Sequence, residues 1–318
     1  MEIEALRARR AERRRQIRRR RLSAALILAA IAAVIAIVVL AAGSGKGAHA
    51  VADAAHSSSS AARHARAPAS SSVSTRTGPP GARAVPILMY HVIAAPPAGA
   101  PFPGLYVEPA EFAEQMHALA SAGWHAVTLD QVEEYWRRGV SLGAGKPIVI
   151  SFDNGYNSQY TQALPVLRSL GWVGDENLQL SGLPPSQGGL GAGQIRGLLA
   201  SGWELDTQGI SHADLITLDA EALHNQVAVA RATLQHRYHV PVNWFCYPSG
   251  HYNATVVAAV KAAGFTGSTT VVPGWAHPED DPYRLHRLRV LGGTSGRGLL
   301  ELVDGAREDP PAPASYSA

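Results

Sequence analysis

One segment predicts the type of fold: Lys146-Pro-Ile-Val-Ile-Ser-Phe-Asp-Asn-Gly-Tyr156. Its first half is apolar and rich in β-branched side chains, which predicts a buried strand over 146–152. The strand then runs into Asp153-Asn154-Gly155, whose residue types are typical of a turn. A helical pattern follows over 158–170. A strand, a polar turn and a helix in this order predict one β/α unit of a parallel sheet.

Similar units lie on both sides of this stretch. The other predicted strands are 84–91, 127–129, 203–205, 242–246 and 266–272. The other predicted helices are 109–121, 130–138 with Asp130 as its N-cap, 194–201, 219–238, 254–263 and 297–306. Strands that alternate with helices favour an α/β fold with a mostly parallel sheet or barrel. The length of the folded part, about 225 residues over 84–308, is normal for a single α/β barrel.

Polar residues fall where the predicted strands end. They are Asp153, then Gln208 and His212, then Tyr247 and Pro248. In parallel α/β folds the active site lies at this C-terminal side of the strands. Each residue alone also has an ordinary explanation, since an acidic residue after a strand is often a turn residue. Their order across three strand ends is what indicates a site.

Three segments at these ends resemble the motifs of polysaccharide deacetylases, the NodB-homology domain of carbohydrate esterase family 4. Ser151-Phe-Asp-Asn-Gly-Tyr156 is similar to the first motif, which is usually T/S-F-D-D-G. Gly202-Trp-Glu-Leu-Asp-Thr-Gln-Gly-Ile-Ser-His-Ala-Asp-Leu215 is similar to the second, and Phe245-Cys-Tyr-Pro-Ser-Gly-His-Tyr252 to the third. Val85–His91 resembles the first strand of the exported branch of the family, and Leu285–Val290 its late L-x-R-x-x-V strand. The resemblance implies a distorted (β/α) barrel with fewer than eight complete units.

The resemblance also implies a reaction, the hydrolysis of acetamide C–N bonds in N-acetylated polysaccharide or peptidoglycan-type glycan. In the family a divalent, zinc-like metal is held by one Asp and two His, and a neighbouring Asp takes a proton from water. Asp153 matches this catalytic base, and Tyr247 matches the backbone N–H that holds the oxyanion. His212 matches the second metal-binding His. Asn154 and Gln208 stand where the metal-binding Asp and the first His are expected.

Two of the three metal ligands are therefore neutral amides, which are poor zinc ligands beside imidazole or carboxylate. Removing only a group that supports a ligand costs ~10–100-fold in affinity or activity, so replacing two ligands should cost more. Two hypotheses follow for this chain. It is either a deacetylase of envelope polysaccharide with attenuated activity, or a catalytically inactive module that binds glycans or acts as a scaffold.

Other residues complete the expected substrate groove. Cys246 occupies a position that carries Arg in many members, so the contact that usually orients the base is expected to be missing. His286 and His91 are the candidates for a general acid, although a structural role fits both at least as well. Pro248 is also placed in the groove. Cys246 is the single cysteine, so no internal disulfide can form, and a lone thiol of this kind is more often buried than reactive.

The first 42 residues predict how the chain is anchored. Residues 1–21 contain ten arginines and three glutamates, a local charge of +7 within a chain of net charge +3. Residues 22–42 are apolar apart from Ser23, and as a helix they span ~31 Å, about the thickness of a bilayer core. The positive flank keeps the N-terminus cytoplasmic, so the folded part is expected outside the plasma membrane. Cleavage at Ala48-His49-Ala50, which gives a secreted protein, is the alternative.

The remaining segments have compositions that cannot form a core. Residues 43–83 are mostly Ala, Ser, Gly, Pro, His and Arg, which predicts a flexible linker, and residues 309–318 predict a disordered tail. Because the excess positive charge belongs to the N-terminal tail, no nucleic-acid partner is expected for the folded part.

Overall fold

The computed structural model describes residues 78–183, 188–307 and 310–317. The predicted cytoplasmic tail 1–21, the membrane span 22–42 and most of the linker 43–83 lie outside these residues. Within the described ranges, no helix combines the length and the apolar character that crossing a membrane requires.

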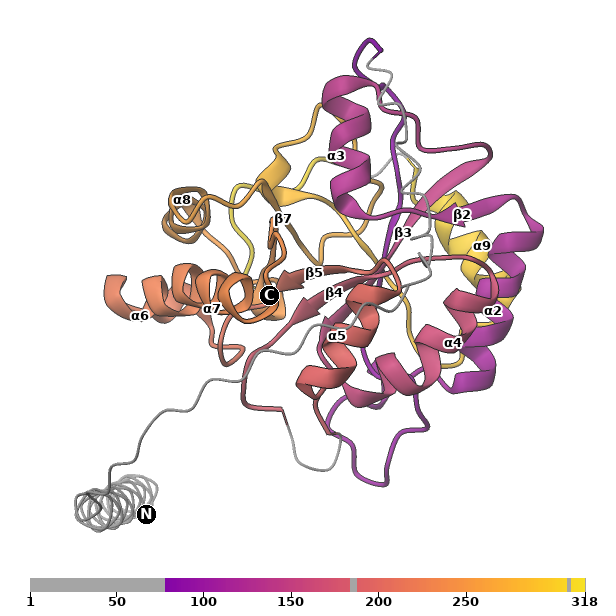
Figure 1. Ribbon diagram of the computed structural model, residues 1–318, viewed down its shortest axis with the longest axis horizontal. Helices are drawn as coiled ribbons and strands as arrows, with labels where there is room; N and C mark the ends of the chain where they lie inside the picture. The colour runs from indigo at the N-terminus through magenta and orange to yellow at the C-terminus, as the bar shows by residue number, and fades with distance from the viewer. Residues whose placement is uncertain (1–77, 184–187, 308–309, 318) are drawn as a thin grey trace, which may run out of the picture. The chain divides into compact units, whose positions relative to one another are not determined.

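A curled parallel sheet lies at the centre of the domain (Figure 1). Its strands are β1 (Ile87–Tyr90), β2 (Trp124–Ala126), β3 (Lys146–Asn154), β4 (Asp175–Leu178), β5 (Glu204–Thr207), β6 (Trp244–Cys246), β7 (Gly267–Thr269) and β8 (Leu288–Arg289). Their order is β7-β6-β5-β4-β3-β1-β8, and β2 pairs with β3. Leu285, just before β8, forms a parallel bridge with Thr269 of β7, so the two ends of the sheet meet. The expected α/β architecture is confirmed in this form.

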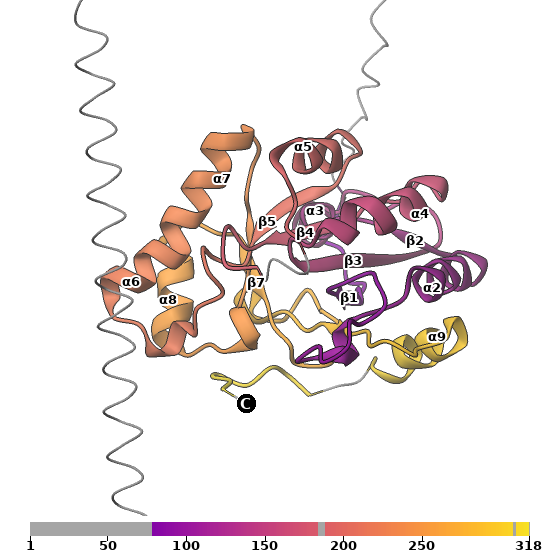
Figure 2. The same cartoon turned by 90° about the horizontal axis from the view of Figure 1, so that it is seen from below.

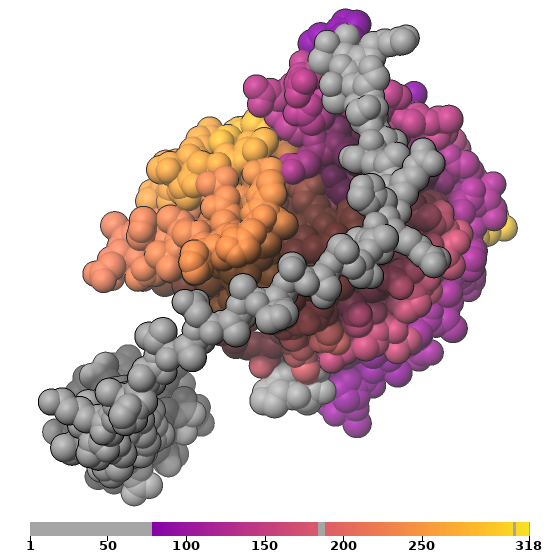
Figure 3. Space-filling model, viewed as in Figure 1, coloured from indigo at the N-terminus to yellow at the C-terminus, as the bar shows by residue number. Residues whose placement is uncertain are grey.

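Helices cover the outside of the sheet. They are α2 (Pro109–Ser121), α3 (Leu129–Arg138), α4 (Leu164–Ser169), α5 (Ala192–Ala200), α6 (Ala220–His224), α7 (Ala230–Tyr238), α8 (Ala254–Ala262) and α9 (Gly296–Gly305). Helices α2, α4 and α9 gather on one side of the domain, and α6, α7 and α8 gather on the other (Figure 2). The space-filling view shows a hollow between the orange segment with α6–α8 and the pink segments beside it (Figure 3).

An aromatic cluster holds β1 and β3 against α2. Phe152 of β3 stacks on Trp203 with ring centroids 4.9 Å apart. Phe152, Tyr90 of β1 and Phe112 of α2 also contact one another, with ring centroids 5.2–5.9 Å apart. All four side chains are buried. Full burial of each such side chain contributes about 1.5–3 kcal/mol, so this cluster fixes the strand whose end carries Asp153.

The start of α3 differs from the prediction. The strand before it is 124–126 rather than 127–129, and the N-cap is Thr128 rather than Asp130. The reason is a reciprocal capping box, in which the Thr128 hydroxyl accepts from the Gln131 N–H and the Gln131 side chain accepts from the Thr128 N–H. Asp130 is left free to accept hydrogen bonds from Asn243 and Trp244.

Strand β4 was not predicted at all. Its sequence Asp-Glu-Asn-Leu contains three residues that are depleted in strands, yet all four are buried between β3 and β5. The sheet therefore contains a polar central strand, which matters for both sites described below.

The domain also extends beyond its expected boundaries. Residues 78–83, placed in the linker by composition, contact α3, since the Gly81 N–H donates to the Tyr135 carbonyl at 2.9 Å and the Trp136 indole donates to the Arg83 carbonyl at 2.9 Å. In the tail, Tyr316 forms two backbone hydrogen bonds of 2.9 Å with Tyr252. These contacts attach residues 78–83 and 310–317 to the fold.

Candidate functional site

Asp153 lies at the C-terminal end of β3 and is only 1% exposed. Arg287 donates to both carboxylate oxygens, with Nη1 2.7 Å from Oδ1 and Nη2 2.9 Å from Oδ2. Asn177 of β4 donates a third hydrogen bond to Oδ1 at 3.0 Å. Burial raises the pKa of Asp153, but the charge and hydrogen bonds of Arg287 outweigh burial and lower this pKa to about 2. Asp153 is therefore a carboxylate at neutral pH.

We expected that no arginine would contact the Asp153 carboxylate and orient it, and this expectation was wrong. Cys246 does occupy the position where many relatives carry Arg, but Arg287 reaches the same carboxylate from the segment before β8. Arg287 is fully buried, and its Nε donates to the Thr270 carbonyl at 2.8 Å, which fixes the guanidinium plane. The sequence signal was present, because Arg287 is the arginine of the L-x-R-x-x-V segment.

His91 follows β1 and lies beside the same carboxylate. Its Nε2 is 3.9 Å from Asp153 Oδ2, and its side chain is 12% exposed. Burial lowers the pKa of His91 to about 4, although Asp153 opposes this shift, so the imidazole is neutral at pH 7. Gln159, which was not predicted as a site residue, donates to the backbone carbonyls of both His91 and Asp153, at 2.9 and 2.8 Å.

Asn154 begins the tight turn after β3. Its φ is 78° and that of Gly155 is 88°, and asparagine is one of the few side chains that adopt this region readily. A Cβ on Gly155 would lie 2.3 Å from Leu178 Cδ1, so only glycine fits there. The Asn154 amide donates to Gln179 Oε1 at 3.0 Å, and Gln179 in turn donates to the Ser181 carbonyl. Gln179 was not predicted as a site residue.

Gln208 and His212 follow β5, near the end of β3. Gln208 is 2% exposed, and its Oε1 has no hydrogen-bond partner within the described part of the chain. His212 is partly buried and adopts a φ of 53°. Burial lowers the pKa of His212, and the negative charge of Asp153 partly opposes this shift. The charge of Asp153 therefore acts on His212.

These donors do not fit a zinc ion. Asn154 and Gln208 can offer only neutral amide oxygens, and the Asn154 amide already bonds Gln179. Zinc sites in proteins are built from thiolate, imidazole and carboxylate ligands. Asp153, the nearby carboxylate, has both of its oxygens bound by Arg287. The residues of the expected metal site therefore supply one strong ligand, His212.

Cys246 also lies inside the site, where its side chain stays a protonated thiol. Its Sγ is 3.6 Å from Asp153 Oδ2 and 3.2 Å from Arg287 Nη2. Burial raises the pKa of Cys246 to about 12, although the charge of Arg287 opposes this. The expectation of a buried cysteine is confirmed.

Three predicted residues lie apart from this cluster. The Tyr247 N–H donates to the Thr269 carbonyl at 3.4 Å and would have to leave this contact to hold an oxyanion, so its role remains a prediction. Pro248 is buried at the start of a short turn over 248–250. His286 does not join the site, because its Nε2 contacts the Pro310 carbonyl at 3.0 Å and its Nδ1 lies 3.6 Å from Asp280. Its neighbour Arg287 points the other way, into the barrel.

Comparisons with known proteins place the chain beside one family. The sequence model of the family described as polysaccharide deacetylase matches residues 142–268. A Bacillus subtilis protein, YxkH, whose name assigns it provisionally to the polysaccharide deacetylases, is 26% identical over 220 residues, which are 69% of this chain and 76% of YxkH.

Solved structures share the fold. The Streptococcus pyogenes deacetylase PplD, solved with acetate, is 22% identical with a TM-score of 0.64, over 72% of this chain and 100% of that one. BC0361, a polysaccharide deacetylase from Bacillus cereus, is 23% identical with a TM-score of 0.61, over 70% of this chain and 69% of that one. IcaB from Ammonifex degensii is 22% identical with a TM-score of 0.58, over 70% of this chain and 97% of that one.

Proposed function

The chain belongs to the polysaccharide deacetylase family, and we propose that it is a deacetylase of strongly reduced activity that acts on N-acetylated polysaccharide of the cell envelope. Hydrolysis joins the oxygen of water to the acetyl carbon and breaks the C–N bond. Acetate leaves, and the sugar nitrogen takes up a proton to become an amine. The observation that carries the proposal is the ionised Asp153, which Arg287 and Asn177 hold at the strand ends.

The side chains around Asp153 have distinct roles in this proposal. Asp153 accepts the proton of the attacking water, and Arg287 positions the carboxylate. His91, neutral at pH 7, lies beside Asp153 without competing for its charge. The neutral amides at two of the three metal-ligand positions support a low rate.

A second candidate function is glycan binding without catalysis. Asn154, Gln179 and Gln208 place amide groups along the ends of β3, β4 and β5. Two of them, Asn154 and Gln208, stand where the family resemblance places an Asp and a His that bind metal. Amides both donate and accept hydrogen bonds, as sugar hydroxyls do. The buried Gln208 Oε1, which has no partner among the described residues, favours this candidate because it can accept from a ligand hydroxyl.

We also propose that residues 22–42 hold the domain at the outer face of the plasma membrane, with residues 1–21 in the cytoplasm. The apolar run and its arginine flank support this topology. Protease added to intact cells should remove the domain from the cell surface and leave the N-terminus protected. Recovery of the whole domain from the culture medium would support cleavage instead.

One experiment separates the two candidate functions. The full-length protein is incubated with oligomers of N-acetylglucosamine, and acetate release and oligomer binding are both measured, with and without EDTA. Asp153→Asn keeps the shape of the side chain but removes the base, and Asp304→Asn, a change of an exposed acid in α9, is the matched control.

Acetate release that Asp153→Asn abolishes, and Asp304→Asn does not, would support the deacetylase. Binding without acetate release, unchanged by EDTA and by Asp153→Asn, would support the glycan-binding module. Absence of both binding and release would reject both.

A further inference from the structure

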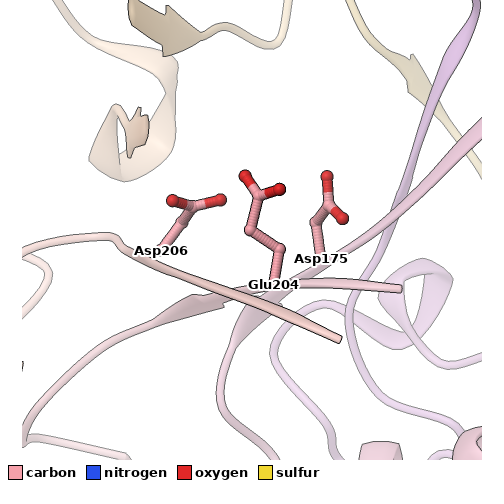
Figure 4. Close-up of side chains that lie close together, drawn as sticks. All are labelled: Asp175, Glu204 and Asp206. Atoms are coloured by element: carbon pink, nitrogen blue, oxygen red, sulfur yellow. The ribbon is translucent and has the colours of Figure 1, made fainter. Parts of the chain in front are cut away.

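We propose that Asp175, Glu204 and Asp206 form a second site, which binds a hard divalent cation and fits Ca²⁺ best. The three carboxylates lie close together inside the curled sheet, two on β5 and one at the start of β4 (Figure 4). The acetamide hydrolysis proposed above uses none of them. The site is therefore independent of the deacetylase proposal.

The parallel pairing of β4 and β5 brings these side chains together. Asp175 is directly opposite Glu204 in the register, and Asp206 is opposite Asn177. Because side chains alternate along a strand, Glu204 and Asp206 project from the same face as Asp175. One oxygen from each residue lies within 4.8 Å of the other two.

Each carboxylate is held by one backbone N–H from a neighbouring segment. Leu129 and Asp130, the first residues of α3, donate to Asp175 Oδ2 at 2.9 Å and to Glu204 Oε2 at 3.0 Å. The Trp244 N–H donates to Asp206 Oδ1 at 2.9 Å. These bonds fix the orientation of all three groups and occupy only one oxygen of each.

The second oxygens accept no hydrogen bond of good geometry from the described residues. Asp175 Oδ1, Glu204 Oε1 and Asp206 Oδ2 are all buried. Contacts with the Thr128 and Asp206 side chains only partly oppose the rise in the Glu204 pKa that burial causes. Asp175 and Asp206 are themselves 0% exposed. A buried polar atom without a partner costs about 1–3 kcal/mol, and more when it is charged. Three such atoms in one cluster indicate that a ligand is held between them.

The charge of the cluster leads to the same conclusion. Among the described residues, no ion pair includes Asp175, Glu204 or Asp206. Asp130, whose charge also raises the pKa of Asp175 and of Glu204, is acidic as well, and both of its oxygens are bound by Asn243. Several like charges in a buried site require either a cation or protons to offset them.

The size and type of the ligands select the ion. The three oxygens lie within 4.8 Å of one another, so one Ca²⁺ ion with ligand distances of about 2.3–2.6 Å can contact all three, and Ca²⁺ accepts irregular sets of carboxylates. Mg²⁺ requires about 2.0–2.1 Å and a stricter octahedron. The cluster offers oxygens alone, which disfavours zinc. Glu204 is less buried than the two aspartates, and water molecules would supply the remaining ligands of the ion.

The alternative is that the three groups share protons. Burial, and after it the nearby carboxylates, raise the pKa of Glu204 to about 7. Burial likewise raises the pKa of Asp175 and of Asp206 well above the usual value. Protons would satisfy the cluster at low pH but would leave as the pH rises, whereas a Ca²⁺ ion would remain bound at pH 8.

The test uses the full-length protein, stripped with a chelator and returned to pH 8. CaCl₂ is titrated by calorimetry, and thermal unfolding is followed by circular dichroism with and without Ca²⁺. We expect one bound Ca²⁺ per chain, a higher Tm with Ca²⁺, and a smaller effect of MgCl₂. Absence of Ca²⁺ binding by the unmodified protein at pH 8, or a Tm that Ca²⁺ does not raise, would overturn the proposal.

Variants locate the bound ion. Glu204→Gln keeps the side-chain length and should weaken Ca²⁺ binding by at least ~10-fold. Glu301→Gln, an exposed glutamate that pairs with Arg297 on α9, is the matched control and should bind Ca²⁺ as the unmodified protein does. Equal Ca²⁺ affinity in Glu204→Gln and in the unmodified protein would place the ion elsewhere and overturn the assignment. Because binding by the unmodified protein is measured directly, the result does not depend on how well a variant folds.

Discussion

Arg287 holds both carboxylate oxygens of Asp153, at 2.7 and 2.9 Å, in a fully buried ion pair. The pair joins β3 to the segment before β8, residues that are far apart in the sequence. A bidentate arrangement of this kind fixes the carboxylate in direction as well as in charge. The pair therefore links the stability of the barrel to the geometry of its candidate active site.

Breaking this pair should be costly. Arg287→Met keeps much of the side-chain volume but leaves a buried carboxylate without its partner, so we expect a loss of about 3–5 kcal/mol in the free energy of unfolding. Urea denaturation measures this loss, and Arg289→Met, at an exposed position two residues away, is the control. The pair would have no structural role if both variants unfolded at the same urea concentration.

The same pair predicts how stability depends on acid. The folded pKa of Asp153, about 2, lies below its ordinary value of 3.8, so its stabilising contribution is complete above pH 3.8. That contribution is lost as the pH falls from 3.8 through 2, and it amounts to about 2 kcal/mol. Urea unfolding at several pH values between 2 and 5 should show this loss, and Asp153→Asn should flatten the curve in that range. An equal slope in the two proteins would contradict the assigned pKa.

Much of the fold follows from the hydrophobic pattern. The helix 109–121 was predicted to the residue, because Pro109 and Gly123 mark its ends. The strand 146–152 was also found, two residues short of β3, because polar residues at its end suggested a turn. Strand β4 could not be predicted, since its stability comes from hydrogen bonds and from both neighbouring strands rather than from apolar side chains.

The site could be predicted only in part. Asp153 was predicted from its strand end and motif position, and His91 was one of two candidates for the general acid. The structure places His91 Nε2 3.9 Å from Asp153 Oδ2. The partner of Asp153 was misjudged, because the pairing with Arg287 spans 134 positions in the sequence and depends on how the barrel closes. Gln179 was missed for the same reason, since only the pairing of β3 with β4 brings it to Asn154.

Cys246 should be unreactive in the folded protein. Its thiol is fully buried, and burial raises its pKa to about 12, so almost no thiolate is present at pH 8. Iodoacetamide should label Cys246 only after unfolding in urea, as measured by mass spectrometry. Rapid labelling without denaturant would show that the site opens to solvent.

The acidic cluster predicts a loss of stability at higher pH in protein free of Ca²⁺. The folded pKa of Glu204, about 7, lies above its ordinary value of 4.5, so its contribution is complete below pH 4.5 and is lost as the pH rises through 7. Thermal unfolding in EDTA should therefore give a lower Tm at pH 8 than at pH 5. Glu204→Gln should reduce this difference, whereas Glu301→Gln should leave it unchanged. A pH-independent Tm in EDTA would show that Glu204 is ionised throughout.

Restoring the metal ligands tests whether the groove is otherwise intact. Asn154→Asp with Gln208→His supplies one carboxylate and a second imidazole beside His212, so we expect Zn²⁺ binding and acetate release from N-acetylglucosamine oligomers. In the unmodified protein Gln179 Oε1 accepts a hydrogen bond from the Asn154 amide nitrogen at 3.0 Å. In Asn154→Asp a carboxylate oxygen takes the place of that nitrogen, and it repels Gln179 Oε1. Gln179 must therefore turn its amide, and this releases the Ser181 carbonyl.

Adding Gln179→Ala removes this conflict and should raise the affinity for Zn²⁺ above that of the double variant. Metal content by mass spectrometry and acetate release are measured on all variants, with Asp153→Asn added to the triple variant as the control that retains metal but lacks the base. If the triple variant binds Zn²⁺ and releases more acetate than the unmodified protein, the reduced activity that we propose is explained by the ligands. If it binds Zn²⁺ without releasing acetate, the groove has also lost its catalytic geometry, and glycan binding becomes the better description of the function.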